Sequence, residues 1–375
     1  MTSTATARKG PVRFAVIGQG YFAQSAILPA FKNAKRSCTL AAIFSDDQTK
    51  LRALQDRYRV EHALPYERYD DFLRTGAVDA VYIALPNDLH ADYAIRAARA
   101  GVHVLCEKPI AGSSADAERM ISACADCGVK LMIAYRLHFE EANLSAIELV
   151  HRGEIGEPRY FSALFSQQIL AGNTRTQSVH HGGPLRDIGI YCINAARYVF
   201  RDEPTEVVAF AAQKRGEQRF AEIDEQVGAL LRFPGERLAQ ITCSFGAAEQ
   251  SSYTVVGTEG SLCVSPAYGA STDLAWELTS NGKSKKKIFK KRDQVAPELI
   301  EFAGCIRQGR VPTASGREGL ADLRVIEAIE ASIKSAGRVE VSRQQPEQRP
   351  SLRQERRAPA HEVPTLVNVH PPTAH

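Results

Sequence analysis

The chain has 375 residues, 44% of them hydrophobic and 24% charged, with a formal net charge of +4. This length suggests about two domains, and the composition is that of a globular protein. The excess of basic residues is concentrated in the ranges 283–292 and 349–357, and no nucleic-acid-binding motif accompanies them. We therefore expect these two ranges to be solvated loop and tail, and we expect no nucleic-acid partner.

Other features of the sequence argue against further classes of protein. The first ten residues contain no apolar core of a secretory signal, and no stretch approaches the ~20 apolar residues of a membrane span. The eight cysteines are scattered, and the single CxxC, from Cys124 to Cys127, falls in a helical pattern without a second pair. We expect a cytoplasmic protein with no membrane association and no metal site.

Residues 11–135 alternate between short β-rich runs and helical patterns. The expected strands are 12–17, 40–44, 80–85, 102–106 and 130–135, and the expected helices are 21–32, 47–58, 69–75, 88–100 and 113–127. Asp88 and Ser113 are suitable N-caps, and Gly101 and Gly128 are suitable helix ends. After a disordered start at 1–10, this alternation predicts an α/β domain with a parallel, doubly wound sheet.

The pattern changes after Tyr135. Longer β-type runs follow a helix at 140–152, with a hairpin signal at Pro234 and Gly235. The expected strands are 159–168, 206–213, 226–233, 237–245 and 252–256, and the expected helices are 185–200, 297–308 and 317–336. Runs of strands predict a C-terminal α+β domain over 136–340, built on a large, mostly antiparallel open sheet. The range 341–375 predicts an extended or disordered tail, whose apolar end is able to dock on a neighbour.

The first expected strand ends in a GxGxxA motif, Gly18-Gln-Gly20-Tyr21-Phe22-Ala23, and a helix follows at once. In such a turn the glycines let the backbone approach a pyrophosphate, and the helix N-terminus supplies N–H donors and a positive dipole end. Because the motif follows a strand and begins a series of βαβ units, it predicts dinucleotide binding in a Rossmann domain rather than a merely structural turn.

The end of the second expected strand bears on the choice of cofactor. An acidic residue there accepts the ribose 2′-hydroxyl of NAD, whereas a small polar residue with a nearby cation accommodates the 2′-phosphate of NADP. Ser45 at the strand end and Lys50 one turn later favour NADP, while Asp46 favours NAD unless it caps the next helix. We expect NADP as the preferred cofactor, with NAD as the alternative.

Two further turns should lie at the same edge of the sheet, where ligands of such folds bind. Pro86 and Asn87 follow the strand 80–85, although Asn87 also suits a plain turn before a helix. Lys108 follows the strand 102–106. A lysine that leaves a strand is more often a solvated charge, but Pro109 makes this turn stiffer than a surface loop requires.

Asp187 and Tyr191 stand four residues apart at the start of the helix 185–200, so their side chains share one helix face. A carboxylate beside a phenol suits acid–base chemistry. An N-cap aspartate next to a half-buried tyrosine would give the same pattern, and this segment alone leaves both interpretations open.

Together, these segments resemble the Gfo/Idh/MocA oxidoreductase family over most of residues 11–335. The resemblance rests on the GxGxxA turn, the Leu85-Pro-Asn loop with His90, the Glu107-Lys-Pro turn, and the helix that carries Asp187 and Tyr191. Within the family, the segments look most like the branch of glucose–fructose oxidoreductase and aldose dehydrogenases. The resemblance implies an N-terminal Rossmann domain and a second domain whose sheet often forms an interface, so we expect a homodimer or homotetramer through the C-terminal sheet.

The resemblance also assigns residues. Lys108 is expected to contact the nicotinamide ribose and the substrate, Asp187 and Tyr191 to complete the catalytic site, and Tyr135 to border the pocket. The residues expected at the cofactor are Gly18, Gly20, Tyr21, Phe22, Ala23, Ser45, Lys50, Tyr66, Leu85, Pro86, Asn87, His90, Glu107, Lys108 and Arg136.

The chain departs from the family pattern just before Asp187. A glycine triplet common there is His181-Gly-Gly in this chain, and the preceding loop lacks an expected Trp-Arg pair. Arg175, His180 and His181 are therefore candidates for substrate contacts on position alone.

The expected activity is reversible hydride transfer between a nicotinamide cofactor and a sugar or polyol, as in an aldose dehydrogenase or a glucose–fructose oxidoreductase-like enzyme. Tyr191 would act as general base, assisted by Lys108 because nearby positive charge favours the phenolate, and Asp187 would orient a sugar hydroxyl. The alternatives are a cyclitol or amino-sugar dehydrogenase with the same machinery and, from another class, a catalytically silent NAD(P)-binding sensor or regulator.

Overall fold

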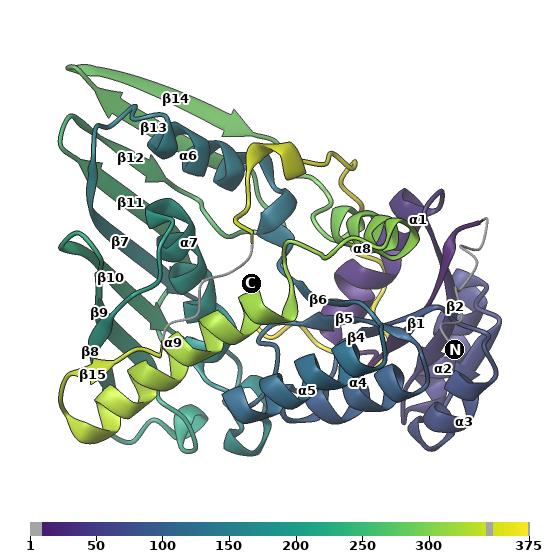
Figure 1. Ribbon diagram of the computed structural model, residues 1–375. Helices are drawn as coiled ribbons and strands as arrows, with labels where there is room; N and C mark the ends of the chain where they lie inside the picture. The colour runs from purple at the N-terminus through teal and green to yellow at the C-terminus, as the bar shows by residue number, and fades with distance from the viewer. Residues whose placement is uncertain (1–9, 343–347, 374–375) are drawn as a thin grey trace.

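The computed structural model describes residues 10–342 and 348–373. It contains a six-stranded sheet from the first part of the chain and a nine-stranded sheet from the second. Figure 1 shows the helices α6 (Glu141–His151), α7 (Ile190–Phe200) and α9 (Gly316–Ser335) on the face of the larger sheet that turns toward the smaller one. The apolar side chains between these layers form one continuous core.

The first sheet is the predicted Rossmann sheet, with all strands parallel in the order β3-β2-β1-β4-β5-β6. Its strands are β1 (Val12–Ile17), β2 (Cys38–Phe44), β3 (His62–Leu64), β4 (Ala80–Ile83), β5 (His103–Glu107) and β6 (Leu131–Ala134). Its helices are α1 (Leu28–Ala34), α2 (Gln48–Tyr58), α3 (Tyr69–Arg74), α4 (His90–Arg99) and α5 (Ser114–Asp126). The chain order reverses between β1 and β4, which is where such sheets bind ligands.

The helix caps follow the sequence in part. Ser113 caps α5 by accepting a hydrogen bond from the Asp116 N–H, and Gly101 and Gly128 take the left-handed conformation after their helices. The prediction for Asp88 was wrong, because Asp88 lies in a short 3₁₀ turn before α4 and its carboxylate is 2.9 Å from His180 Nδ1 instead. Strand β3 was not predicted, because three residues carry too little alternation to be recognised.

The second sheet is open and mostly antiparallel, as predicted, in the order β14-β13-β12-β11-β7-β10-β9-β8-β15. Only one of its neighbouring pairs, β7 with β10, is parallel within the described residues. The strands are β7 (Pro158–Ser166), β8 (Glu206–Ala212), β9 (Gln226–Phe233), β10 (Arg237–Ser244), β11 (Gln250–Gly257), β12 (Gly260–Val264), β13 (Leu274–Ser280), β14 (Lys283–Phe289) and β15 (Val339–Glu340). Helix α8 (Ala296–Gln308) follows the last hairpin and precedes α9.

The two basic ranges are more ordered than expected. Residues 283–289 form the edge strand β14 rather than a solvated loop, and a lysine-rich edge discourages pairing with another sheet. In the C-terminal range, Arg349 pairs with the buried Glu203 at 2.8 Å, and Arg356 pairs with Glu301 at 2.5 Å. Charge runs alone did not reveal these contacts, because the acidic partners are distant in sequence.

A buried ion cluster lies beneath α7. Arg197 is fully buried, and its guanidinium pairs with Glu203 at 2.6 Å and with Glu318 at 2.7 Å, and also with Asp322. Burial disfavours each of these charges, but the clustered opposite charges compensate for much of that cost. The cluster joins α7 to α9, and we interpret it as structural.

Candidate active site

The GxGxxA turn has the geometry that a pyrophosphate requires. Gly18 has a φ of +96°, and a Cβ there would lie 2.4 Å from the Ala84 carbonyl oxygen, so only glycine fits. Nothing lies within 4 Å of the position that a Cβ on Gly20 would occupy, which leaves room for a ligand above the backbone. A π-helical turn, Ala23–Ile27, starts immediately afterwards and continues into α1. These residues fit a dinucleotide.

The end of β2 carries the residues that discriminate between cofactors. Asp47, not Asp46, caps α2, with Oδ1 accepting hydrogen bonds from the Thr49 and Lys50 N–H groups. Ser45 is buried, and its hydroxyl accepts a hydrogen bond from the Asp47 N–H. Asp46 is exposed, and burial together with this carboxylate raises the pKa of the Tyr66 phenol. Ser45 and Lys50 thus lie on either side of the cap of α2, and Tyr66 lies close enough to Asp46 for that carboxylate to act on its phenol.

Two turns at the same edge are held together by His90. Its ring is fully buried, with Nε2 2.9 Å from the Leu85 carbonyl oxygen and Nδ1 2.9 Å from the Pro109 carbonyl oxygen. Burial lowers the pKa of His90, which favours the neutral ring. The predicted contact of His90 with the cofactor is thus at most indirect, because backbone groups occupy both ring nitrogens.

Lys108 lies at the carboxyl end of β5, and its side chain contacts Asp187 of the second domain. Its ammonium donates to the Asp187 carboxylate at 2.9 Å and to the Asp187 carbonyl oxygen at 2.6 Å. Its side chain is only 12% exposed, so it is not a solvated charge. Burial opposes the charge, but the carboxylate of Asp187 outweighs this effect and raises the pKa of Lys108. Lys108 therefore keeps its proton.

Asp187 receives a second cation from the loop 171–183. Arg175 Nε lies 2.9 Å from Asp187 Oδ2. Burial would raise the pKa of Asp187, but Lys108 and Arg175 together lower it to about 2. The carboxylate is thus held as an anion between two cations, one from the Rossmann domain and one from the loop 171–183.

Tyr191 lies one helical turn after Asp187, with cations against its ring. Lys108 Nζ is 5.1 Å and Arg136 Cζ is 4.9 Å from the ring centroid. Phe165 and Tyr268 pack on the same ring, with centroids 5.7 and 5.9 Å away. Within residues 10–342 and 348–373, no partner hydrogen bonds the Tyr191 hydroxyl, so the phenol is available to a ligand.

Tyr135 and Arg136 follow strand β6, and the side chains of both have partners inside the protein. Tyr135 is 4% exposed and its ring stacks on His138 within the core, so these contacts give no support to its predicted contact with the substrate, which stays a prediction. Arg136 is bonded to the Gln294 side chain and, at 2.5 Å, to the Tyr268 carbonyl oxygen, and it reaches the site only through its face on Tyr191.

Glu107 is held beneath the turn that it begins. Its carboxylate accepts a hydrogen bond from the Tyr82 hydroxyl at 2.8 Å. Burial raises the pKa of Glu107, with Lys108 opposing this shift. These contacts turn Glu107 inward rather than toward an open cofactor rim.

The loop 171–183, where the chain departs from the family pattern, is attached to the first domain by His180 and His181. His180 pairs with Asp88 at 2.9 Å, and the His181 carbonyl oxygen accepts a hydrogen bond from Asn87 Nδ2 at 3.0 Å. A Cβ on Gly112 would lie 2.4 Å from the His181 ring, so the ring packs directly on the backbone of the β5–α5 connection. This loop therefore closes over the edge of the Rossmann sheet.

Sequence reasoning missed two supports of the site. Arg186 makes a two-bond contact with Glu330 at 2.7 and 2.8 Å and donates to the Gly112 carbonyl oxygen at 2.9 Å. It was hidden because Glu330 lies far away in the sequence. Gly112, by contrast, had a visible signal, since a glycine three residues after Pro109 suits the close approach of another group to the backbone.

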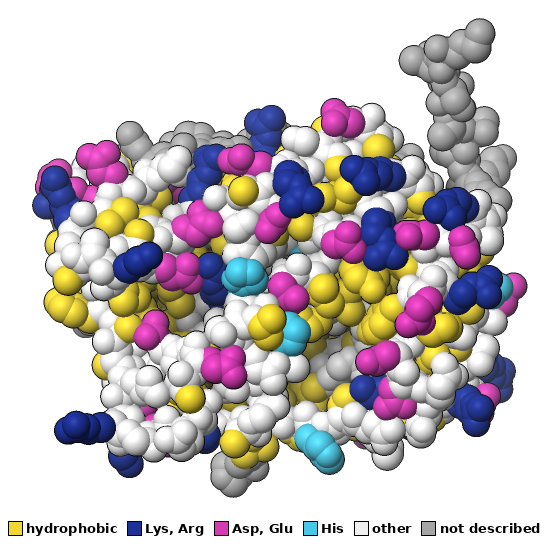
Figure 2. Space-filling view, turned by 90° about the horizontal axis from the view of Figure 1, so that it is seen from below, with side chains coloured by type: hydrophobic (Ala, Val, Ile, Leu, Met, Phe, Trp, Pro, Cys, Tyr) yellow, Lys and Arg dark blue, Asp and Glu magenta, His cyan; other side chains and the backbone are white. Residues whose placement is uncertain are grey.

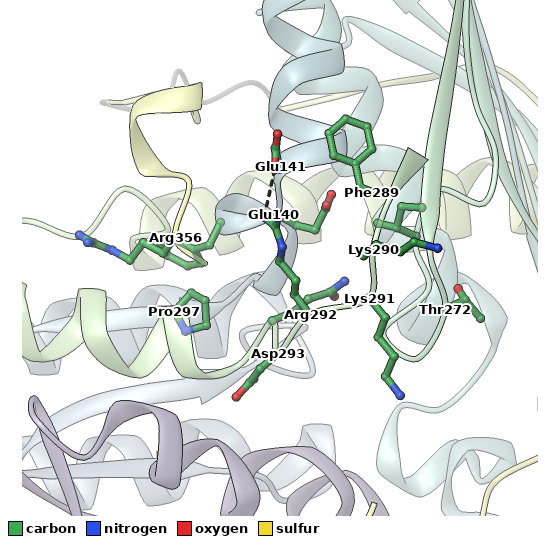
Figure 3. A pocket seen from close by; sticks show the side chains of 13 residues that line it. Glu140, Glu141, Thr272, Phe289, Lys290, Lys291, Arg292, Asp293, Pro297 and Arg356 are labelled. Carbon is green, nitrogen blue, oxygen red and sulfur yellow. Dashed lines mark hydrogen bonds and ion pairs between the residues drawn. The ribbon is translucent and has the colours of Figure 1, made fainter. Parts of the chain in front are cut away.

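Other surface features do not provide a competing site. A pocket between α6, β14 and the C-terminal segment, shown in Figure 3, is lined largely by charged residues, several of which pair with each other, such as Glu141 with Arg292 at 3.0 Å. On the face shown in Figure 2, acidic and basic side chains are interspersed without a continuous basic surface. In the described ranges, no cluster of three or more potential metal ligands occurs, and no helix is long and apolar enough to cross a membrane.

Comparison with known proteins gives the family. Residues 12–135 match the model of the oxidoreductase family with an NAD-binding Rossmann fold, and residues 144–263 match the model of the Gfo/Idh/MocA C-terminal domain. The chain belongs to the Gfo/Idh/MocA oxidoreductase family. The resemblance predicted from the motifs is thus confirmed, and so is the expected pairing of a Rossmann domain with a large, mostly antiparallel sheet.

Several relatives of this chain are named for reactions of sugars. The NADP-dependent D-xylose 1-dehydrogenase of Haloarcula marismortui is 36% identical over 331 residues, which cover 86% of this chain and 91% of the relative. The aldose–aldose oxidoreductase of Caulobacter crescentus, solved with glycerol, has a TM-score of 0.84 at 34% identity and covers 88% of this chain and 100% of its own. A 3-ketoreductase from Actinomadura kijaniata, solved with NADP and TDP-benzene, has a TM-score of 0.78 at 28% identity, with 86% of this chain and 98% of that chain covered. This chain is accordingly an oxidoreductase of CH–OH groups.

Proposed function

We propose that this Gfo/Idh/MocA protein is an NADP-dependent oxidoreductase of aldoses, with Lys108, Asp187 and Tyr191 at its catalytic centre. One cluster of side chains supports this proposal most directly. In it, Lys108 and Arg175 hold Asp187 as an anion. Lys108 and Arg136 also lie against the ring of Tyr191. Such an environment of strongly paired charges at the ligand edge of a sheet is typical of a catalytic site. The xylose dehydrogenase and aldose oxidoreductase relatives support a sugar as substrate.

The protein's own residues would bind the sugar and move one proton. When bound, the cofactor supplies the redox chemistry by exchanging a hydride with the carbinol carbon of the sugar. Tyr191, acting as the phenolate, accepts the hydroxyl proton: among the described residues no partner hydrogen bonds its hydroxyl, and Lys108 and Arg136 lie against its ring. Lys108 donates a hydrogen bond to the reacting oxygen, and the Asp187 carboxylate accepts one from a neighbouring sugar hydroxyl. The loop of Arg175 and His180 closes the pocket.

NADP is the proposed cofactor rather than NAD. Asp47 is used as the helix cap and Ser45 is the small residue at the strand end, with Lys50 in the first turn of α2. This arrangement suits a 2′-phosphate better than a bare ribose. Fluorescence titration with NADPH and NADH tests it, and tighter binding of NADH would contradict it.

Activity is tested by mixing the protein with NADP⁺ or NAD⁺ and a panel of aldoses, cyclitols and amino sugars, and by following absorbance at 340 nm. Aldose-dependent reduction of NADP⁺ is the expected result, while preference for a cyclitol would support the alternative dehydrogenase. A retained cofactor would give no bulk signal, so formation of sorbitol from a mixture of glucose and fructose is measured in parallel. Cofactor binding without either reaction would indicate a sensor.

Lys108→Ala and Tyr191→Phe test the assigned roles. Each is expected to lower turnover by about 10²–10⁴-fold, the usual contribution of a positioned acid or base, while NADPH binding stays near that of the wild type. Turnover of Tyr191→Phe close to the wild-type value would refute its role as the base.

The outer face of the second sheet is the proposed interface of a homo-oligomer. Phe210 is 75% and Leu230 44% exposed on this face, and Val208, directly opposite Leu230, is 40% exposed. A contiguous apolar face is unusual on a monomer. Light scattering should give at least twice the 41.1 kDa chain mass, and Phe210→Arg should shift the protein toward a monomer without loss of helical signal.

A further inference from the structure

The C-terminal segment 361–373 lies on the cofactor side of the Rossmann domain. Val367 makes two reciprocal hydrogen bonds with Gln24: Gln24 Nε2 donates to the Val367 carbonyl oxygen at 2.9 Å, and the Val367 N–H donates to Gln24 Oε1 at 2.8 Å. Gln24 is fully buried and directly follows the GxGxxA turn. The segment is therefore attached at the entrance to the pyrophosphate turn.

A second attachment lies at the adenosine end. Asn368 Nδ2 donates to Asp47 Oδ2 at 3.0 Å, and Asp47 is the residue that caps α2 at the end of β2. Arg57 Nη1, near the other end of α2, donates to the Thr365 carbonyl oxygen at 2.5 Å. The segment thus follows the element that binds the adenosine ribose in this fold.

The third attachment is on the other domain. The Leu170 N–H donates to the Pro372 carbonyl oxygen at 2.9 Å, and Ile169 pairs with Thr373 in an antiparallel bridge. Residues 169 and 170 immediately precede the loop of Arg175. From Asn368 to Pro372 the chain advances at most about 14 Å, so it must cross directly from the end of β2 to the second domain.

The segment is also fixed upstream. His361 Nε2 lies 3.1 Å from the Ser25 carbonyl oxygen, and its other ring nitrogen lies 3.6 Å from Asp293. Asn33 Nδ2 donates to the Pro359 carbonyl oxygen at 2.9 Å. Figure 1 shows the yellow segment passing α8 and α1 and returning to the middle of the molecule, and Figure 3 shows Arg356 and Asp293 near its start. Because both ends are held, residues 361–373 form a strap rather than a free tail.

We propose that this strap is part of the dinucleotide site: it covers the adenosine end of the cofactor and controls how fast the cofactor leaves. The inference rests on the proposed binding of NADP between Gly20 and Ser45. A cofactor held there has the Rossmann domain on one side and the strap on the other, so its release requires the bonds to Gln24 and Asp47 to break. The same strap also contacts residues 169 and 170, which precede the loop of Arg175. A change in cofactor binding should therefore change the position of that loop.

The experiment compares the full chain with a chain ending at residue 360 and with two point variants, Val367→Pro and Asn368→Ala. Val367→Pro removes the N–H that donates a hydrogen bond to Gln24 Oε1. Asn368→Ala removes the side-chain amide that donates a hydrogen bond to Asp47 Oδ2. Val363→Ala is the matched control, because Val363 is 53% exposed. NADPH dissociation is measured by stopped-flow displacement with excess NADP⁺, and folding is checked by thermal unfolding.

The truncated chain is expected to release NADPH at least about tenfold faster, since several hydrogen bonds each contribute a few-fold, with smaller increases for the point variants and none for Val363→Ala. Proteolytic cleavage within 361–373 is expected to slow when NADPH is added, because the linkage is reciprocal. Equal dissociation rates from folded full-length and truncated chains would overturn the strap. Tighter binding by the truncated chain would also overturn it, by showing that the strap occupies the site. Failure of every variant, wild type included, to bind NADPH would instead refute the proposed cofactor.

Discussion

Lys108 donates to both the carboxylate and the backbone carbonyl of Asp187, at 2.9 and 2.6 Å, across the boundary between the two domains. A lysine from the Rossmann sheet is thereby neutralised by an aspartate from the second domain, next to the phenol of Tyr191. The ion pair connects the fold to the proposed chemistry, because the contact that joins the two charges also brings Lys108 beside the ring of Tyr191.

This relationship predicts a large effect on stability. Asp187→Asn leaves the buried ammonium without its anion and is expected to lower the free energy of unfolding by about 3 kcal/mol, as for other broken buried pairs. Lys108→Met combined with Asp187→Asn should cost less than the sum of the single changes, because neither charge is then left unpaired. Urea unfolding measures both.

The matched control is the exposed pair of Arg74 with Asp71, whose side chains are 69% and 65% exposed. Asp71→Asn should change the free energy of unfolding by no more than about 0.5 kcal/mol. Equal effects of Asp71→Asn and Asp187→Asn would contradict the interpretation.

Gly112 is predicted to accept a side chain only if the His181 ring moves away. Gly112→Ala places a Cβ 2.4 Å from the His181 ring and should displace the loop 171–183, so that kcat/KM falls by at least about tenfold through loss of positioning. Gly228→Ala, where the nearest atom is 3.9 Å away, is the control and should leave kinetics unchanged. Because His181→Ala removes the obstructing ring, the melting temperature of the double variant should recover toward that of His181→Ala alone.

The buried cluster around Arg197 predicts a second, purely structural effect. Arg197→Met removes the cation that Glu203, Glu318 and Asp322 share, which leaves the buried Glu318 and Asp322 without it while Glu203 keeps Arg349 at 2.8 Å. The expected loss is about 3–5 kcal/mol in the free energy of unfolding. At temperatures where the variant is folded, the KM for the sugar should be unaltered. A shift in KM comparable to that of Lys108→Ala would show that the cluster reaches the site.

Attachment of the strap should depend on pH through His361. The carboxylate of Asp293 raises the pKa of His361, against the effects of burial and of Lys291. A raised pKa means that the contribution is fully present below the unfolded value of about 6.5 and is lost as pH rises through the folded value. Hydrogen exchange of 361–373, corrected for intrinsic rates, should therefore accelerate between pH 6 and 8.5. His361→Gln should remove this dependence, and a wild-type strap with equal protection at both pH values would contradict it.

The sequence predicted the elements with strong periodicity and the turns with distinctive residues. The GxGxxA turn, the parallel strands and the helix with Asp187 and Tyr191 were accessible because each is a local pattern. Strands β12, β13 and β14 were missed, and β14 in particular is dominated by lysines and pairs only with the adjacent β13 among the described residues. β-Strands of this kind are defined by their partners more than by their own residues.

Within the site, long-range contacts limited the prediction. The resemblance assigned Tyr135 to the border of the pocket, whereas the chain turns there and buries the ring against His138. The apolar end of the tail was expected to meet a neighbour, whereas Val367 and Asn368 bind the Rossmann domain of their own chain. Neither outcome can be read from one segment, because His138 is itself in contact with the Tyr198 hydroxyl, 60 residues away, and Gln24 lies 343 residues before Val367.

The parallel pairing of β7 with β10 has a consequence for how the molecule is made. Strand β7 lies inside the second sheet, yet both of its neighbours, β10 and β11, follow it by about 80 residues. During synthesis, the central strand therefore leaves the ribosome with no strand to pair with, while the Rossmann half is already complete. Because closing such long loops is slow and leaves apolar strand edges open, the second domain should be the late step in folding and the part of the nascent chain most in need of chaperones.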